Sequence, residues 1–142
     1  MKGFARVVTL PILWGDMDAL RHVNNTRYFA WFEAARIAYF ERVQPPSGPG
    51  VAQEVGPILA STSCDYLRPV VYPATVRVGV KVTEIGTSSL RMEYAVTCAA
   101  APAELCARGT SVIVLVRYAT LEKVRVPDDL RAAVAALEQT AG

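Results

Sequence analysis

The residues best suited to chemistry lie in one segment of the chain, between Trp14 and Arg36. It contains two aspartates two residues apart, the only histidine and two adjacent asparagines: Asp16, Asp18, His22, Asn24 and Asn25. An aromatic, helix-like stretch follows at once, and the first N–H groups of a helix have no partner inside it. A carboxylate beside such groups suits catalysis, but an aspartate in front of a helix also commonly caps a turn or the helix itself. Spacing alone leaves both interpretations of Asp18 open.

Asp16 and His22 are also open to more than one interpretation. In an extended segment Asp16 shares a face with Asp18, and two close carboxylates either raise the pKa of one of them or bind a cation. Because a D-x-D pair alone is a weak metal motif, we assign Asp16 a structural role and expect no metal and no cofactor. From the residues alone, His22 is a turn residue that bonds to the backbone.

One long helix must position these groups. The pattern predicts a helix that is capped by Asn25 or Thr26 and runs to about Arg42. Asn24 and Asn25 are expected to satisfy donors at the helix start. Its apolar residues surround the axis on every side, which is typical of a buried helix, and Glu33 and Arg36 alone interrupt them before its end. The Pro- and Gly-rich segment 45–50 ends the helix with a flexible loop.

The remaining segments predict strands and one short helix. Phe4–Trp14 is strand-like, and apolar runs predict strands at Ile58–Leu67, Val76–Thr83, Leu90–Cys98 and Ala107–Tyr118, before an amphipathic helix that Pro127 opens. The simplest packing is a curved antiparallel sheet wrapped around the one long buried helix. We therefore expect an α+β hotdog fold, as a single domain over residues 1–142. Pairing of two subunits would bury the open sheet edge and the other helix face.

Composition and charge narrow the classes of function. The hydrophobic fraction of 52% is high for a small monomer, so we expect a homo-oligomer. The net charge of +2 and the scattered basic residues give no support to nucleic-acid binding. Cys64, Cys98 and Cys106 lack metal-type spacing and are typical of buried thiols in a reduced protein. Without an apolar leader or the roughly 18 apolar residues of a membrane helix, we expect a cytoplasmic protein with no membrane partner.

Several separate motifs resemble one family. The segment from Asp16 to Tyr28, followed by Glu33-Ala34-Ala35-Arg36, is similar to the D-x-D-x-x-G-H-V-N-N-x-x-Y and E-x-x-R patterns of the hotdog acyl-CoA thioesterases of the 4-hydroxybenzoyl-CoA thioesterase family. Residues 65–70 resemble its Y-L-R-P-V motif, Gly86 with Ser88-Ser89 its I-G-x-x-S turn, and Gly109-Thr110 its final core strand. The resemblance implies active sites at a dimer interface, in a homodimer or a homotetramer of two dimers, and a catalytic carboxylate at Asp18.

The resemblance thus implies hydrolysis of an acyl-CoA thioester to free acid and CoA. Asp18 is then the general base or the nucleophile. The backbone N–H of Asn25, at the start of the helix, is our choice for the group that polarises the carbonyl. The residues expected to support or contact the substrate are His22, Tyr28, Ser61, Thr62 and Ser89.

Some of these residues have a structural interpretation beside the functional one. Tyr28 contacts the acyl chain or belongs to the core. Ser61 and Thr62 line the site from the partner subunit or are ordinary strand residues. Glu33 forms a buried ion pair with Arg36 or, less in keeping with a catalytic Asp18, acts as the helix glutamate of related hotdog enzymes.

The sequence departs from the family pattern at two places. Arg21 stands where members usually have Gly, so either the loop suits a residue that disfavours positive φ or a charge lies at the pocket mouth. Residues 86–88 offer no cation where some members present Lys or Arg to the CoA nucleotide; backbone donors or another arginine would have to substitute (Arg68, Arg91 or Arg117). An acyl-carrier-protein substrate therefore stays open.

Two further functions are compatible with the fold. A hotdog dehydratase would use His22 with Glu33, but the H-F-P context of those enzymes is missing. A non-catalytic acyl-thioester binding protein would bind CoA esters without turnover.

Overall fold

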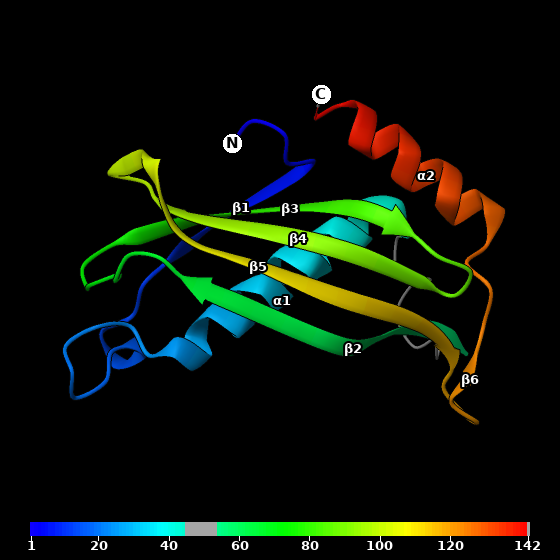
Figure 1. The fold of residues 1–142 in the computed structure, drawn as a ribbon, viewed down its shortest axis with the longest axis horizontal. Coiled ribbons are helices and arrows are strands. Elements are labelled where there is room, and N and C mark those ends of the chain that lie inside the picture. The colour runs from blue at the N-terminus through cyan, green and yellow to red at the C-terminus, as the bar shows by residue number, and fades with distance from the viewer. Residues whose placement is uncertain (45–53, 142) are drawn as a thin grey trace.

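The computed structural model describes residues 1–44 and 54–141, so the loop predicted at 45–50 lies outside the described residues. The elements follow the order β1 (Arg6–Pro11), a 3-10 turn η1 (Trp14–Asp16), α1 (Asn25–Val43), β2 (Val55–Tyr66), β3 (Thr75–Ile85), β4 (Ser89–Cys98), β5 (Ala101–Arg117), β6 (Glu122–Lys123) and α2 (Asp128–Gln139). Within the described residues the strands form one antiparallel sheet in the order β1-β3-β4-β5-β2, and β6 pairs with the end of β5 (Figure 1).

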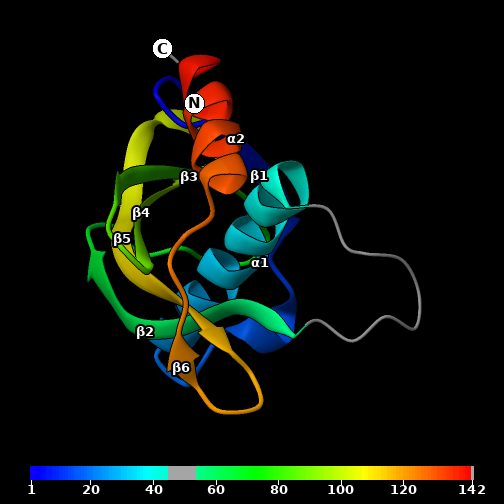
Figure 2. The ribbon, with the colours of Figure 1, turned by 90° about the vertical axis from the view of Figure 1, so that its right-hand side faces the viewer.

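Apolar side chains alternate with more polar ones along the central strands, and the apolar ones form the inner face of the sheet. In β3, Val76, Val78 and Val80 are fully buried, whereas Lys81 on the opposite face is half-buried. Because a strand turns successive side chains to opposite faces, this pattern gives the sheet one apolar face. That face curves around α1, with the edge strands β1 and β2 at its two sides (Figure 2). The predicted hotdog architecture is confirmed.

The long helix is buried on one face only. Its buried residues are Tyr28, Trp31, Phe32, Ala35 and Tyr39. Ala30 and Glu33 are exposed, and Ile37 is 52% exposed. The sheet covers α1 from one side, and no described element lies against the opposite face. This open face is the one that the predicted pairing of two subunits would bury.

Close contact between helix and sheet depends on Gly109 of β5. A side-chain carbon at Gly109 would collide with the Phe32 ring and lie 2.7 Å from the carbonyl oxygen of Ser63. Phe32 also stacks on Tyr94 of β4, with ring centroids 4.6 Å apart. Glycine at this position therefore lets α1 rest directly on the centre of the sheet.

Arg36 reaches from α1 into the same region. Its Nη1 donates to the hydroxyl of Tyr94 at 3.2 Å, and that hydroxyl lies 2.6 Å from Oγ of the buried Ser111. The Glu33 carboxylate is 3.9 Å from Arg36 Nη2 and 65% exposed. The predicted ion pair is present, but only its Arg36 end is largely buried in the single chain: Arg36 also bonds a tyrosine in the core, and Glu33 lies at the surface.

The C-terminal helix closes the edge of β3 beyond the end of β1. One carboxylate oxygen of Glu138, Oε2, accepts hydrogen bonds from the Val82 amide at 3.0 Å and the Tyr39 hydroxyl at 2.7 Å. Burial and the neighbouring Glu138 carboxylate raise the pKa of Tyr39. Glu138 thus ties α2 both to the sheet and to α1.

The cysteines differ in exposure. Cys106 is buried, whereas Cys64 and Cys98 are half-buried, so the expectation of buried thiols is correct only for Cys106. All three are free, and the sulfur atoms of Cys98 and Cys106 are 3.8 Å apart. No helix in residues 1–44 or 54–141 is long and apolar enough to cross a membrane.

Candidate active site

Asp18 lies in the loop between η1 and α1, where its own backbone closes a turn. The Asp18 amide donates to the carbonyl of His22 at 3.0 Å, and the Arg21 amide donates to the carbonyl of Asp18 at 3.0 Å. The carboxylate is exposed. Its Oδ1 accepts from the amide of Leu20 at 2.9 Å, and its Oδ2 lies 3.4 Å from the side-chain nitrogen of Asn24. One oxygen is thus held by the turn, while the other has a single long contact.

Asn24, and not Asn25 or Thr26, caps α1. Its Oδ1 accepts from the amide of Thr26 at 2.9 Å and from the hydroxyl of Thr26 at 2.7 Å. Asn25 is consequently the first residue inside the helix. Its amide has no acceptor within the described residues, as expected for the first turn of a helix. Asp18 therefore does not cap the helix, because Asn24 fills that role, but its carboxylate does cap the turn through the amide of Leu20.

Asp16 is committed to structure. Its Oδ2 accepts from the amide of Leu13 at 2.8 Å, and its Oδ1 pairs with Nε of Arg27 at 3.5 Å. Its carbonyl also accepts from the Asn24 amide at 2.8 Å. The carboxylates of Asp16 and Asp18 thus bind different partners. Among the described residues no three His, Cys, Asp or Glu side chains gather as ligands for a metal.

Tyr66 also lies in this region, although the sequence alone does not mark it as a site residue. From the end of β2, its hydroxyl donates to the carbonyl of Asn25 at 2.9 Å. Its ring meets that of Tyr28 edge to face, with centroids 4.9 Å apart. Only its position in the sequence could have indicated this role, because Tyr66 belongs to a motif at the end of a predicted strand. The sequence does not show which helix residue faces that strand end.

Tyr28 is a core residue in the single chain, with 3% of its surface exposed. It packs against Trp31, with ring centroids 4.5 Å apart. Burial, and to a smaller extent the neighbouring thiols of Cys106, Cys64 and Cys98, raise its pKa to about 12. Its hydroxyl therefore stays protonated at neutral pH.

The other predicted residues divide into two groups. His22 belongs to the Asp18 turn through its carbonyl; its imidazole is exposed and has no hydrogen-bond partner in the described part of the chain. Ser61, Thr62 and Ser89 pair with Val112, Ser111 and Val114 of β5, whereas Tyr66 pairs with Ala107. At about 3.3 Å per residue they lie roughly 13 to 23 Å along β5 from the Tyr66 end. A single chain does not bring them to Asp18.

Arg21 has a backbone φ of 66°, in the left-handed region. The alternative of a loop that suits a residue disfavouring positive φ is therefore wrong. The loop keeps the backbone shape that glycine adopts freely, and this chain places an arginine on it.

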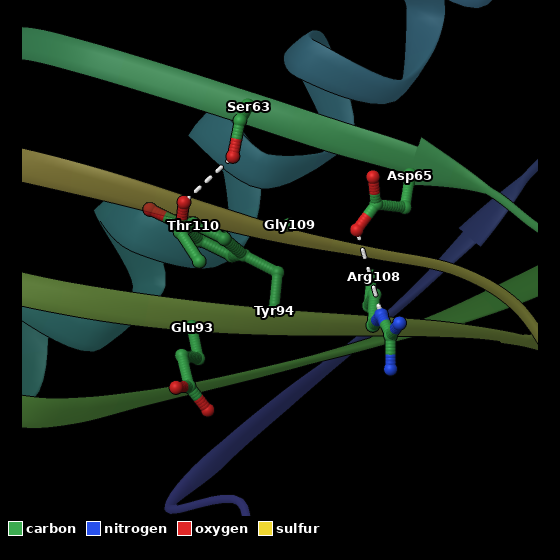
Figure 3. Close-up of a pocket in the computed structure, with 7 residues that line it drawn as sticks. All are labelled: Ser63, Asp65, Glu93, Tyr94, Arg108, Gly109 and Thr110. Carbon is green, nitrogen blue, oxygen red and sulfur yellow. Dashed lines mark hydrogen bonds and ion pairs between the residues drawn. The ribbon is translucent and has the colours of Figure 1, made fainter.

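A polar hollow of about 260 Å³ lies on the outer face of the sheet (Figure 3). Asp65 pairs with Arg108 at 3.5 Å across it, and the hydroxyls of Ser63 and Thr110 are 2.7 Å apart. Figure 3 shows α1 behind the sheet, on the side away from these side chains. Because the polar groups already satisfy one another and the hollow faces away from α1, we do not assign it to the active site.

Comparisons with known proteins agree with this architecture. A family model described as the thioesterase-like superfamily matches residues 12–134. The chain is 37% identical to the PA2801 protein of Pseudomonas aeruginosa, with a TM-score of 0.83 over 92% of this chain and 98% of that one. It is 35% identical to a thioesterase from Thermus thermophilus complexed with coenzyme A and Zn, with a TM-score of 0.84 over 98% of both chains.

A curated relative, the uncharacterized protein YsmA of Bacillus subtilis, is 33% identical over 85 residues. This match covers 60% of the present chain and 56% of YsmA, little more than half of that relative. The family model covers most of the chain, and the expected resemblance is confirmed. The chain belongs to the thioesterase-like superfamily.

Proposed function

We propose that the protein hydrolyses acyl-CoA thioesters to a free acid and CoA. The observation that carries this proposal is the position of the Asp18 carboxylate, which is exposed and in contact with the residue that caps α1. Membership of the thioesterase-like superfamily supports the reaction type, and the coenzyme A in the Thermus relative supports the carrier.

Asp18 acts as general base or as nucleophile. As base, it takes a proton from water while the water oxygen attacks the thioester carbon, the C–S bond breaks and the thiolate of CoA is protonated on leaving. As nucleophile, it displaces CoA and forms an anhydride, which water then cleaves. In both routes the Leu20 amide fixes one oxygen, Oδ1, so that Oδ2 is the oxygen free to react.

The start of α1 supplies the donor for the substrate carbonyl. The Asn25 amide has no internal acceptor among the described residues, and the helix dipole adds partial positive charge there. Loss of one such donor typically costs on the order of a hundredfold in rate. Tyr66 supports this arrangement as a positioning residue, because its hydroxyl binds the carbonyl of the same residue, Asn25.

An apolar hollow between α1 and β2 suits the far end of a long acyl chain, because Ile37 lies roughly 18 Å along α1 from Asn25. The two elements run side by side from the Tyr66–Asn25 hydrogen bond to a hollow of about 270 Å³. Its lining is mostly apolar and includes Ile37, Phe40, Ile58 and Leu59. Leu59 and Ile37 are 46% and 52% exposed, so this seam offers apolar surface to an acyl chain.

A second copy of the chain would complete the site, in a homodimer or a homotetramer. Among the described strands, the edge strand β2 has unpaired backbone on one side, and its residues are exposed along most of its length. Pairing there would place Ser61 and Thr62 of one subunit beside its partner. The distance of these residues from Asp18 within one chain supports a role from across the interface.

A panel of thioesters tests the proposal directly. Short, long and aromatic acyl-CoA esters are compared with the same acyl groups on acyl-carrier protein, and released thiol is measured while light scattering gives the oligomeric state. We expect saturable hydrolysis of CoA esters by a dimer or tetramer. Faster turnover of the carrier-protein esters would indicate an acyl-carrier-protein thioesterase. Tight binding of CoA esters without turnover would indicate a non-catalytic binding protein.

A further inference from the structure

Arg21 keeps a backbone conformation that costs stability. Its φ of 66° places Cβ close to the following carbonyl group, which is unfavourable for residues other than glycine. The turn requires this shape, because the Arg21 amide bonds the Asp18 carbonyl while the Leu20 amide bonds the Asp18 carboxylate. Residues in strained backbone conformations cluster at functional sites. The strain at Arg21, beside Asp18, therefore suggests that the arginine side chain has a function.

The charge of Arg21 is also uncommitted. Other arginines at this end of the molecule form ion pairs: Arg27 with Asp16 at 3.5 Å and Arg68 with Glu104 at 3.6 Å. Arg21 is exposed and has no carboxylate within 4 Å among the described residues. It is therefore a cation that the described part of the fold leaves available beside Asp18.

The surroundings of Arg21 are apolar and open to solvent. The neighbouring Leu20 is 78% exposed, and Trp14, in the 3-10 turn η1 before the loop, is 73% exposed. The loop lies at the N-terminal end of α1, at the lower left of Figure 1. Arg21 therefore stands at the outer rim of the proposed site, where the carrier of an acyl group remains in solvent while the thioester reaches Asp18.

We propose that Arg21 is a specificity-determining residue that binds a phosphate of the thiol carrier. This inference rests on the proposed thioester hydrolysis. The planar guanidinium matches a phosphate with two parallel hydrogen bonds. Coenzyme A and a carrier protein both attach the acyl group through phosphopantetheine, so the shared ligand is its phosphate; CoA adds the phosphates of the nucleotide.

Three variants separate charge from backbone shape. Arg21→Gly removes the charge and the backbone strain, Arg21→Asn removes the charge with a side chain that tolerates positive φ, and Arg21→Lys keeps the charge. Arg125→Gln is the matched control, since Arg125 is exposed and pairs with Asp128 at the start of α2. KM and kcat are measured for one acyl group on CoA, on phosphopantetheine, on carrier protein and on N-acetylcysteamine, which has no phosphate.

We expect KM for the CoA ester to rise about tenfold in Arg21→Gly and Arg21→Asn with kcat unchanged. KM for the N-acetylcysteamine ester stays the same, and Arg125→Gln resembles the wild type. Arg21→Lys keeps the charge but loses the two parallel hydrogen bonds, so its KM for the CoA ester should rise less than in Arg21→Gly. If KM also rises for the phosphopantetheine and carrier-protein esters, Arg21 binds the phosphate that all three carriers share. If KM rises for the CoA ester alone, Arg21 binds a phosphate of the nucleotide. Relief of strain should raise the melting temperature of Arg21→Gly by a few degrees.

Equal changes of KM on all four substrates, or no change on any, would overturn the proposal. Binding of free CoA and of unphosphorylated pantetheine by calorimetry keeps the two proposals distinguishable. If the wild type hydrolyses no thioester, the proposed function fails, yet weaker CoA binding with unchanged pantetheine binding in Arg21→Gly still supports the phosphate contact. Equal CoA binding by the wild type and Arg21→Gly would refute it.

Discussion

The side chain of Asn24 joins Asp18 to the first turn of α1. Its oxygen accepts the amide of Thr26, and its nitrogen lies 3.4 Å from Oδ2 of Asp18. The same residue therefore begins the helix and orients the proposed catalytic carboxylate.

Substitution of Asn24 should separate these two tasks. Asn24→Ser keeps an oxygen that caps the helix but removes the donor to Asp18, whereas Asn24→Ala removes both. We expect Asn24→Ala to lower the free energy of unfolding by about 1 kcal/mol and Asn24→Ser to change it little. Both should lower kcat several-fold. Urea unfolding and steady-state kinetics measure the two effects, and full activity in Asn24→Ser would remove Asn24 from the account.

Tyr66→Phe should lower both activity and stability. The change removes the hydrogen bond to Asn25 and leaves the ring that packs against Tyr28. We expect a loss of about 0.5–1.5 kcal/mol in unfolding free energy and a several-fold fall in kcat. Tyr118→Phe is the matched control, because the Tyr118 hydroxyl also donates to a backbone carbonyl, that of Pro57, at 3.0 Å. Equal kinetic effects of the two variants would contradict a positioning role.

Tyr28 should make stability fall in alkaline solution. Burial raises its pKa from 10.0 to about 12, so the folded state holds this proton more tightly than the unfolded state does. The resulting stability is fully present below pH 10 and is lost as the pH rises toward 12. The slope for one proton is at most about 1.4 kcal/mol per pH unit. Urea unfolding over this range should show a smaller decline for Tyr28→Phe, and parallel curves for both proteins would disprove the assignment.

The architecture can be predicted from the sequence because the spacing of apolar residues within one strand or helix depends on that segment alone. The alternating valines of β3 and the aromatic residues of α1 each mark the face of their own element that packs against a neighbour. A sheet wrapped around a helix can therefore be predicted from these two patterns. The extent of burial does not follow. The aromatic pattern of α1 does not distinguish a face covered by the sheet from one that stays open in the single chain, as at Ile37.

The site was predictable where it is local and was missed where it depends on packing between distant segments. Asp18 contacts Asn24, at the start of α1, because one short loop connects them. Tyr66 is 41 residues from Asn25, and only the arrangement of β2 beside α1 brings its hydroxyl to that carbonyl. The sequence also does not decide which of Asn24 and Asn25 caps the helix, since neighbouring asparagines have the same capping chemistry.

Asp18→Asn tests the central claim most directly. Asparagine has the same shape and retains an oxygen for the Leu20 amide, but it is neither a base nor an effective nucleophile. With the acyl-CoA ester that the wild type hydrolyses best, we expect kcat to fall by at least about a hundredfold with little change in melting temperature. Asp16→Asn, which removes only the ion pair with Arg27, should keep most of the activity. An Asp18→Asn protein that hydrolyses the ester at the wild-type rate would contradict the account.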